Sequence, residues 1–150
     1  MPSRHYDPSA IEDIKILKAR YFRYLDTKQW DKFADLFTAD AVGVWDGFEE
    51  GGSRFEGGAL IADTIRRKCA DALTVHHGHM PEIQLTGATS ARGVWAMYDY
   101  VKMPEVTFEG HGHYHEDYVL TNDGWKIHRL RLTRLSQTII EGSGASMLEK

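Results

Sequence analysis

The hydrophobic pattern of this chain changes its period once, at about Thr74. Before that point apolar residues recur at the three- and four-residue spacing of amphipathic helices. After it they alternate with polar residues, as in half-buried strands. A chain in which helices precede long strands folds as an α+β protein, with the helices covering one face of a sheet. The sequence therefore predicts an α+β fold in which a curved, mostly antiparallel sheet wraps around a long N-terminal helix accompanied by two further helices.

The helical part begins with the strongest signal in the chain. Ser9 is predicted to cap the first helix, and Glu12 completes a capping box three residues later. A short second helix starts after Asp26 or Thr27 and carries aromatic residues up to Phe37. The predicted helices cover residues 9–25, about 27–37 and 59–73. Between the last two, we expect a short strand over 41–45, an Asp-Gly turn, and a glycine-rich loop over 49–58.

The second half of the chain predicts four long strands. A hairpin turn at Asn122-Asp123-Gly124 joins the last two strands. Simple alternation in the last strand places Ile127 and Leu135 on one face and Leu130, Leu132 and Arg134 on the other. A curved sheet closed by a helix leaves a blind cavity, which favours a small ligand. The predicted strands cover residues 74–85, 88–103, 106–121 and 125–140.

Composition narrows the class of protein. The 150 residues favour one domain, with a core over about 9–140 and flexible tails at 1–8 and 141–150. The net charge is -4 and basic residues are scattered, so nucleic acid is not an expected partner. A single cysteine, Cys69, excludes an internal disulfide and a thiolate zinc cluster, and is interpreted as an inert, half-buried thiol. Without a long apolar run, we expect no membrane span, no export signal and a cytoplasmic location.

Asp26 lies where the predicted first helix ends, an unfavourable place for a negative charge because the helix macrodipole is negative there. One interpretation is that Asp26 caps the second helix, whose N-terminus favours a carboxylate. The other is that Asp26 accepts a hydrogen bond from the proton-bearing nitrogen of a histidine. The sequence leaves both interpretations open.

Two phenols and an imidazole complete a possible catalytic set. Tyr21 lies on the apolar face of the first helix and Tyr24 near the edge of that face. On the first long strand, His76 faces the opposite side from the adjacent His77. A carboxylate that orients an imidazole beside a phenol can move protons on a small substrate, whereas the alternative for both tyrosines is core packing. Together with Asp26, these residues favour an enzyme over a plain binding domain.

Three more histidines alternate along the third long strand: His111, His113 and His115. Such spacing can hold a metal ion in a β-barrel pocket, as in cupins, so a metal-dependent enzyme is one alternative. The favoured interpretation is a polar cavity wall or sheet surface, and no metal ligand is predicted.

Two charged residues lie within predicted strands, where an unpaired charge is costly if it is buried. Asp99 lies in the middle of the second long strand and Arg134 near the end of the last. Either both face solvent, or both line a cavity and pair there through a substrate. The chain has no nucleophile elbow and no glycine-rich phosphate loop. Any catalysis is therefore expected to be proton transfer without a cofactor.

At these residues the chain resembles the SnoaL-like branch of the NTF2-like superfamily, over about residues 11–134. This branch includes scytalone dehydratase and bile-acid 7α-dehydratase, and its fold is a cone-shaped curved sheet wrapped on a long helix. The segments that carry the resemblance are RYFRYLD at 20–26, WD at 30–31, TVHHGHMPEI at 74–83, and DGWKI at 123–127.

The resemblance implies roles for individual residues. In the bile-acid enzyme, the catalytic tyrosine, the orienting aspartate and the histidine match Tyr21, Asp26 and His76. Its mid-strand aspartate and late arginine match Asp99 and Arg134. All five are therefore expected to be catalytic.

The second enzyme implies substrate contacts. Scytalone dehydratase shares the equivalents of Asp26 and His76 and uses a second histidine on a later strand, for which His113 is the candidate. Where that enzyme carries a further active-site tyrosine, this chain offers Trp45. Tyr24 is the third predicted substrate contact.

The function implied by the resemblance is that of a cofactor-independent lyase acting on a small, hydrophobic, cyclic or aromatic hydroxylated substrate. His76, held by Asp26, would remove a proton while Tyr21 stabilises the oxyanion that develops. The alternatives are an isomerase or cyclase in the same cavity, or a ligand-binding module on the same fold. Relatives form dimers or trimers, so a homo-oligomer is expected, with Trp125, Ile127 and Leu135 available at its interface.

Overall fold

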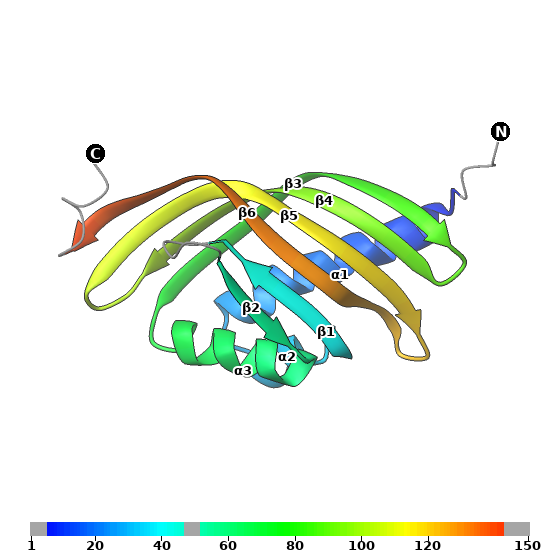
Figure 1. Ribbon diagram of the computed structural model, residues 1–150, viewed down its shortest axis with the longest axis horizontal. Coiled ribbons are helices and arrows are strands. Elements are labelled where there is room, and N and C mark those ends of the chain that lie inside the picture. The colour runs from blue at the N-terminus through cyan, green and yellow to red at the C-terminus, as the bar shows by residue number, and fades with distance from the viewer. Residues whose placement is uncertain (1–5, 47–51, 143–150) are drawn as a thin grey trace.

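The computed structural model describes residues 6–46 and 52–142. Within these ranges, three helices lie against a single sheet of six strands (Figure 1). The helices are α1 (Pro8–Asp26), α2 (Trp30–Ala34) and α3 (Gly58–Cys69). The strands are β1 (Phe37–Trp45), β2 (Ser53–Glu56), β3 (Leu73–Gly87), β4 (Ser90–Lys102), β5 (Val106–Thr121) and β6 (Gly124–Gly142).

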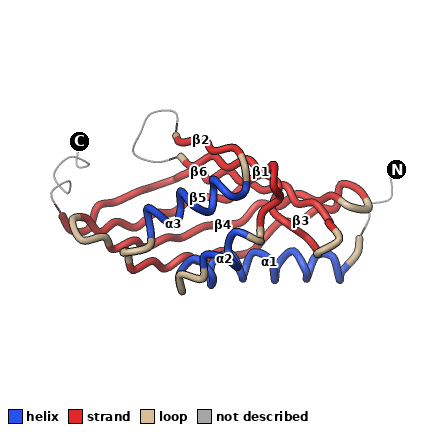
Figure 2. The backbone as a smooth tube through the Cα atoms, turned by 90° about the horizontal axis from the view of Figure 1, so that it is seen from below, coloured by secondary structure: helices blue, strands red, loops and turns tan. Residues whose placement is uncertain are grey.

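The sheet has the strand order β2-β1-β6-β5-β4-β3. Consecutive hairpins connect β3 to β6, and every neighbouring pair is antiparallel except β1 and β6, which run parallel. The long strands arch over α1 in Figure 1, and Figure 2 shows all three helices on the same side of the sheet. The prediction of an α+β fold with a curved, mostly antiparallel sheet around the first helix is confirmed.

Helix α1 supplies the ridge around which the sheet curves. Its apolar face buries Ile14, Leu17, Tyr21 and Leu25 against the sheet. The predicted cap at Ser9 is wrong by two residues: the side chain of Asp7 is the N-cap, and Pro8 occupies the first helical position. Proline is favoured there because its missing N–H would have no partner in the helix.

Other boundaries differ from prediction where a strand competes with a helix or loop. The second helix ends at Ala34, and Phe37 instead begins β1, which pairs with β6. Strand β2 lies within the segment predicted as a loop and pairs with β1. Helix α3 ends at Cys69, and Leu73 begins β3. The turn expected after Asp46, and most of both predicted tails, lie outside the described residues.

Strand β6 breaks the simple alternation that the sequence suggested. Its register with β5 shifts near its start: Arg129 pairs with Asp117, whereas Ile127 pairs with the next residue, Tyr118. The extra residue on β6 is His128, so Ile127 and Leu130 both face the core and are 0% and 2% exposed. The expectation that Ile127 is available at an interface is therefore wrong, whereas Leu135 is 77% exposed.

No helix in the described ranges is long and apolar enough to cross a membrane.

Candidate active site

A cavity of about 420 Å³ lies between the inner face of the sheet and helices α1 and α3. Its wall is mainly apolar. The polar groups among the lining residues include His76, Asp99, Arg134 and Tyr21. The apolar and aromatic side chains that shape the cavity include Leu25, Trp45, Phe55, Ile65, Val101, Met103, Phe108, Tyr114 and Leu132.

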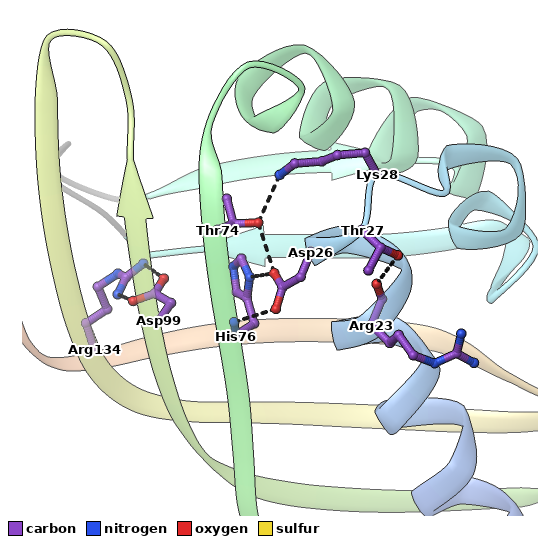
Figure 3. Close-up of polar contacts among 8 residues, drawn as sticks. All are labelled: Arg23, Asp26, Thr27, Lys28, Thr74, His76, Asp99 and Arg134. Atoms are coloured by element: carbon purple, nitrogen blue, oxygen red, sulfur yellow. Dashed lines mark hydrogen bonds and ion pairs between the residues drawn. The ribbon is translucent and has the colours of Figure 1, made fainter.

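Asp26 and His76 form a hydrogen-bonded pair at one side of this cavity (Figure 3). The Nδ1 atom of His76 lies 2.7 Å from Oδ1 of Asp26, and the backbone N–H of His76 donates to Oδ2 at 2.8 Å. The hydroxyl of Thr74 donates to Oδ1 at 2.9 Å and itself accepts from Nζ of Lys28. These contacts fix the carboxylate, which in turn fixes the imidazole ring.

This geometry decides between the two interpretations of Asp26. The cap of α2 is Gln29, without any side-chain hydrogen bond, so the idea that Asp26 caps the second helix is wrong. Helix α1 ends at Asp26, and Lys28 adopts a left-handed conformation with φ of 60°. Left-handed residues commonly end helices, and here the turn leaves the Asp26 carboxylate facing β3.

The pairing also assigns the proton on the ring. An ionised carboxylate can only accept, so Nδ1 of His76 carries the hydrogen that it donates to Asp26. In neutral imidazole, Nε2 is then the basic nitrogen. Among the described residues, none makes a hydrogen bond with Nε2, and His76, with 10% of its side chain exposed, lines the cavity. The arrangement can therefore accept a proton from a bound ligand.

Asp99 and Arg134 form a second pair on the same wall. Arg134 donates from Nη1 and Nη2 to the two carboxylate oxygens of Asp99, at 3.0 and 2.8 Å, and from Nε to the backbone oxygen of Asp46 at 3.2 Å. His76 and Asp99 are direct partners across β3 and β4, which places their side chains next to each other. Both side chains of the pair are nearly buried, at 5% and 13% exposure for Asp99 and Arg134.

Gly110 makes this pairing possible. It is the partner of Asp99 on β5, in the same row across the sheet as His76. A Cβ at Gly110 would clash with Nη1 of Arg134 and come within 2.6 Å of Oδ1 of Asp99. The guanidinium of Arg134 thus occupies the space that a side chain at residue 110 would fill.

Tyr21 reaches the cavity from α1 and is 1% exposed. Its ring meets that of Tyr114 edge to face, with centroids 5.8 Å apart. Burial, with the charge of Glu116 second, raises the pKa of Tyr21 well above its usual value, while a hydrogen bond with the Tyr114 side chain opposes this shift. Burial likewise raises the pKa of Tyr114. Both phenols therefore remain protonated donors at neutral pH.

Of the three predicted substrate contacts, one lines the cavity and two do not. Trp45 lines the cavity and packs against Phe55. Tyr24 does not line it: its ring lies near the cationic groups of Arg23 and Lys32. His113 also lies away from it, on the outer face of β5, because the inward positions on either side belong to Gly112 and Tyr114. Neither Tyr24 nor His113 is placed to touch a ligand in this cavity.

The other histidines of β3 and β5 share that outer face. His77 and His79 are exposed, with ring centroids 6.0 Å apart, and His76 faces the other way, as alternation predicts. His111 and His115 are also exposed and contact Ser136 and Thr133 of β6. The run His111, His113 and His115 therefore forms sheet surface rather than a cavity wall.

Three residues at or next to the cavity were not predicted to belong to the site. Tyr114 lies within the histidine run and could have been found as an inward position between two outward ones. Cys69 also lines the cavity, where burial raises the pKa of its thiol and keeps it protonated. Thr74 carries no local signal, since only the approach of β3 to the end of α1 gives it a role.

Comparison with known proteins adds the family. A family model described as "SnoaL-like domain" matches residues 8–131. The chain is 26% identical over 141 residues to the "Probable cyclase FGR4" of Gibberella zeae, covering 85% of this chain and 93% of that protein. The architecture is the cystatin-like fold of NTF2-like proteins.

Two solved structures share this architecture. One is a protein assigned as a scytalone dehydratase from Novosphingobium aromaticivorans, with a TM-score of 0.75, 19% identity and 85% coverage of each chain. The other is a type 2 hexachlorocyclohexane dehydrochlorinase (LinA), with a TM-score of 0.75, 18% identity, and coverage of 89% of this chain and 88% of that one.

Proposed function

Since the chain belongs to the SnoaL-like domain family, we propose that it is a cofactor-independent lyase. Its reaction would be a dehydratase-like elimination of water from a small, hydrophobic, cyclic or aromatic hydroxylated substrate. The observation that carries this proposal is the 2.7 Å contact between Nδ1 of His76 and Asp26, which leaves Nε2 as the base at a mainly apolar cavity.

The cavity supports the class of substrate. Ligand pockets typically measure about 300–1,000 Å³, and a cavity of about 420 Å³ is at the small end of that range. Apolar and aromatic side chains cover most of the wall, and the polar groups among them include those of His76, Asp99 and Arg134. A ligand of one or two rings with an oxygen directed at those polar groups suits this distribution.

In the first step, Nε2 of His76 takes a proton from the carbon next to a substrate carbonyl. The electron pair of the C–H bond moves into the carbonyl, which becomes an enolate. Tyr21 donates a hydrogen bond to that oxygen as its charge develops. Base catalysis of this kind contributes roughly 10²- to 10⁴-fold in rate, and an oxyanion donor contributes about 10²- to 10³-fold.

In the second step, the enolate electrons return to form the carbon–carbon double bond, and the bond to the β-hydroxyl breaks. The departing hydroxide takes the proton from Nε2, so that water is released and His76 is neutral again. Asp26 stabilises the imidazolium between the two steps, because its charge lies against Nδ1. No redox partner and no further proton are needed.

Arg134 supplies further donors at the same wall. A guanidinium has five N–H donors, and the recorded contacts with Asp99 and Asp46 occupy three of them. Among the described residues, none accepts a hydrogen bond from the other two. We assign them to the leaving hydroxyl or to the substrate carbonyl, with Asp99 holding the guanidinium in place.

The names of the relatives support the reaction class. Dehydratase and dehydrochlorinase both denote eliminations, and the base required is the same whether water or chloride departs. The cyclase among the relatives favours one alternative, an isomerase or cyclase that uses the same proton transfer without a leaving group.

The test uses 3-hydroxy-1-tetralone, which loses water to give fluorescent 1-naphthol. The wild-type protein should accelerate naphthol formation, and His76→Ala should lower kcat by about 10²-fold or more. His77→Ala is the matched control, since the adjacent histidine faces outward and its loss should leave kcat unchanged. Equal activity in the His76→Ala and wild-type proteins would rule out His76 as the base.

A further inference from the structure

A buried ion pair lies next to two tyrosines that line the cavity, and the mechanism above does not use it. Lys18 of α1 and Glu116 of β5 are in direct contact, and both side chains are fully buried. Replacing such a pair by apolar residues commonly leaves a protein as stable or more so, which makes it weak evidence for a purely stabilising role. The place of the pair under the two cavity phenols suggests another role.

The ammonium of Lys18 is held between two aromatic rings. Nζ lies 3.7 Å from the ring centroid of Tyr21 and 3.6 Å from that of Tyr114, with Phe22 farther away at 5.0 Å. The three N–H donors of the ammonium therefore meet one carboxylate oxygen and two ring faces. We call Lys18, Tyr21 and Tyr114 the cation clamp.

Glu116 is fixed from its other side. The hydroxyl of Tyr118 donates to Oε2 of Glu116 at 2.5 Å, and Nε1 of Trp95 donates to the Tyr118 oxygen at 3.0 Å. Among the described residues, every buried polar side-chain atom has a hydrogen-bond partner. These contacts hold the Glu116 carboxylate in place, and the carboxylate in turn holds the Lys18 ammonium against both rings.

We propose that Lys18 is a positioning residue that holds and polarises the Tyr21–Tyr114 pair, so that the phenol facing the substrate becomes a stronger hydrogen-bond donor. A cation on the face of a phenol withdraws electron density from the ring and its oxygen, which strengthens donation to a developing enolate. The catalytic part of this inference rests on the function proposed above, whereas the polarisation of the rings does not.

The charge of Lys18 can be removed by pH as well as by substitution. Burial lowers the pKa of Lys18 to about 8, although Glu116 opposes the shift. The other titratable groups that face the ammonium are Tyr21 and Tyr114, and burial raises the pKa of each well above 10. Burial also raises the pKa of Tyr118, which lies behind Glu116, well above 10. Near pH 8, Lys18 is therefore the member of this cluster that changes charge.

The first measurement follows the phenols by NMR, in protein labelled with [13Cζ]tyrosine. Tyr21→Phe and Tyr114→Phe assign the two resonances. Both should shift together with one inflection near pH 8, and the Lys18→Met/Glu116→Gln double variant, which keeps the cluster neutral, should lack it. Glu116→Gln alone should move the inflection to lower pH, because the group that favours the ammonium is gone. An inflection that persists in the double variant, or tyrosine resonances that are the same in the wild-type and double-variant proteins at pH 7, would overturn the proposal.

The second measurement is turnover of 3-hydroxy-1-tetralone. The double variant should lower kcat by about tenfold, less than the loss of a direct oxyanion donor, with KM unchanged. An unchanged kcat in the double variant, when Tyr21→Phe does lower kcat, would reduce Lys18 to a structural residue. If Tyr21→Phe itself leaves kcat unchanged, the proposed function fails instead, and the NMR titration alone decides whether the clamp polarises the phenols.

Discussion

The negative charge of Asp26 is unfavourable for its own helix, and its contacts with β3 explain why an acidic residue is found there. A carboxylate at the C-terminal end of α1 is disfavoured by the helix dipole, by roughly 0.3–1 kcal/mol at an exposed site. It accepts instead from the ring and backbone N–H of His76 and from the hydroxyl of Thr74. These three contacts are the local reason for an acidic residue at this position, and they select the tautomer of His76.

We expect Asp26→Asn to abolish most activity while the protein stays folded. The amide nitrogen of asparagine would face Nδ1, which favours the tautomer with hydrogen on Nε2 and removes the base from the cavity. The expected loss in kcat is about 10²- to 10⁴-fold on 3-hydroxy-1-tetralone. Thr74→Val is the matched control: it removes one contact to Asp26 but keeps the bond to His76, so its loss should be much smaller. Similar losses in both variants would mean that the tautomer is not what matters.

At the scale of elements, strand alternation predicts side-chain direction until a bulge interrupts it. In β3, His76 points inward and His77 and His79 outward, as a period of two requires. In β6, the extra residue at His128 moves Ile127 onto the core face. Bulges depend on the partner strand and have no sequence signal here. This is why the inward direction of His76 could be predicted and the burial of Ile127 could not.

The bulge in β6 has a testable consequence for the free energy of unfolding. Ile127→Ala should lower the free energy of unfolding by about 2–5 kcal/mol, as expected for a buried large-to-small change. Leu135→Ala, on the same strand and 77% exposed, should change it by less than about 0.5 kcal/mol. Simple alternation would place both residues on one face and give them similar effects. Denaturant unfolding of the two variants, followed by circular dichroism, distinguishes the two descriptions.

At the scale of the whole molecule, the layer between helix and sheet is rich in tyrosine. Tyr21, Tyr114 and Tyr118 are each about 1% exposed, and burial raises the pKa of each well above 10. A group whose pKa is higher in the folded than in the unfolded state supports folding below the unfolded pKa of about 10. That support is lost as the pH rises above this value.

Alkaline titration should therefore proceed in two stages. Exposed tyrosines should ionise first, with the fold intact, and the three buried phenols should ionise only as the protein unfolds. The measurement is tyrosinate absorbance against pH, followed in parallel with far-ultraviolet circular dichroism. A complete titration of all seven tyrosines with unchanged circular dichroism would contradict the described burial.

Much of this molecule follows from local patterns. The amphipathic period of α1, the alternation of the long strands and the hairpin at Asp123-Gly124 predict the α+β layers and the order of most elements. What escaped depends on contacts between distant segments. Strand β2 forms because β1 offers it an edge, and Lys18 can lie on the apolar face of α1 because Glu116 reaches it from β5.

In the candidate site, too, local patterns predict some features, and the others depend on contacts between distant segments. Asp26, Asp99 and Arg134 stand out in the sequence because a charge at each position needs a partner if it is buried, and the structure gives each of them one. His113 is the candidate that the resemblance implies, but it lies on the outer face of β5, and its neighbour Tyr114 lines the cavity. The missing signal was again the partner, since Tyr114 is inward through its packing against Tyr21.

The measurement that tests the central claim most directly is hydrogen exchange at the carbon next to the carbonyl of 1-tetralone in D₂O. This ketone has no leaving group, so the assay isolates proton abstraction. We predict that the wild-type and His77→Ala proteins accelerate deuterium uptake equally, and that His76→Ala falls to the uncatalysed rate. Exchange that persists without His76, or no acceleration by the wild-type protein, would contradict the claim that His76, held by Asp26, is a catalytic base.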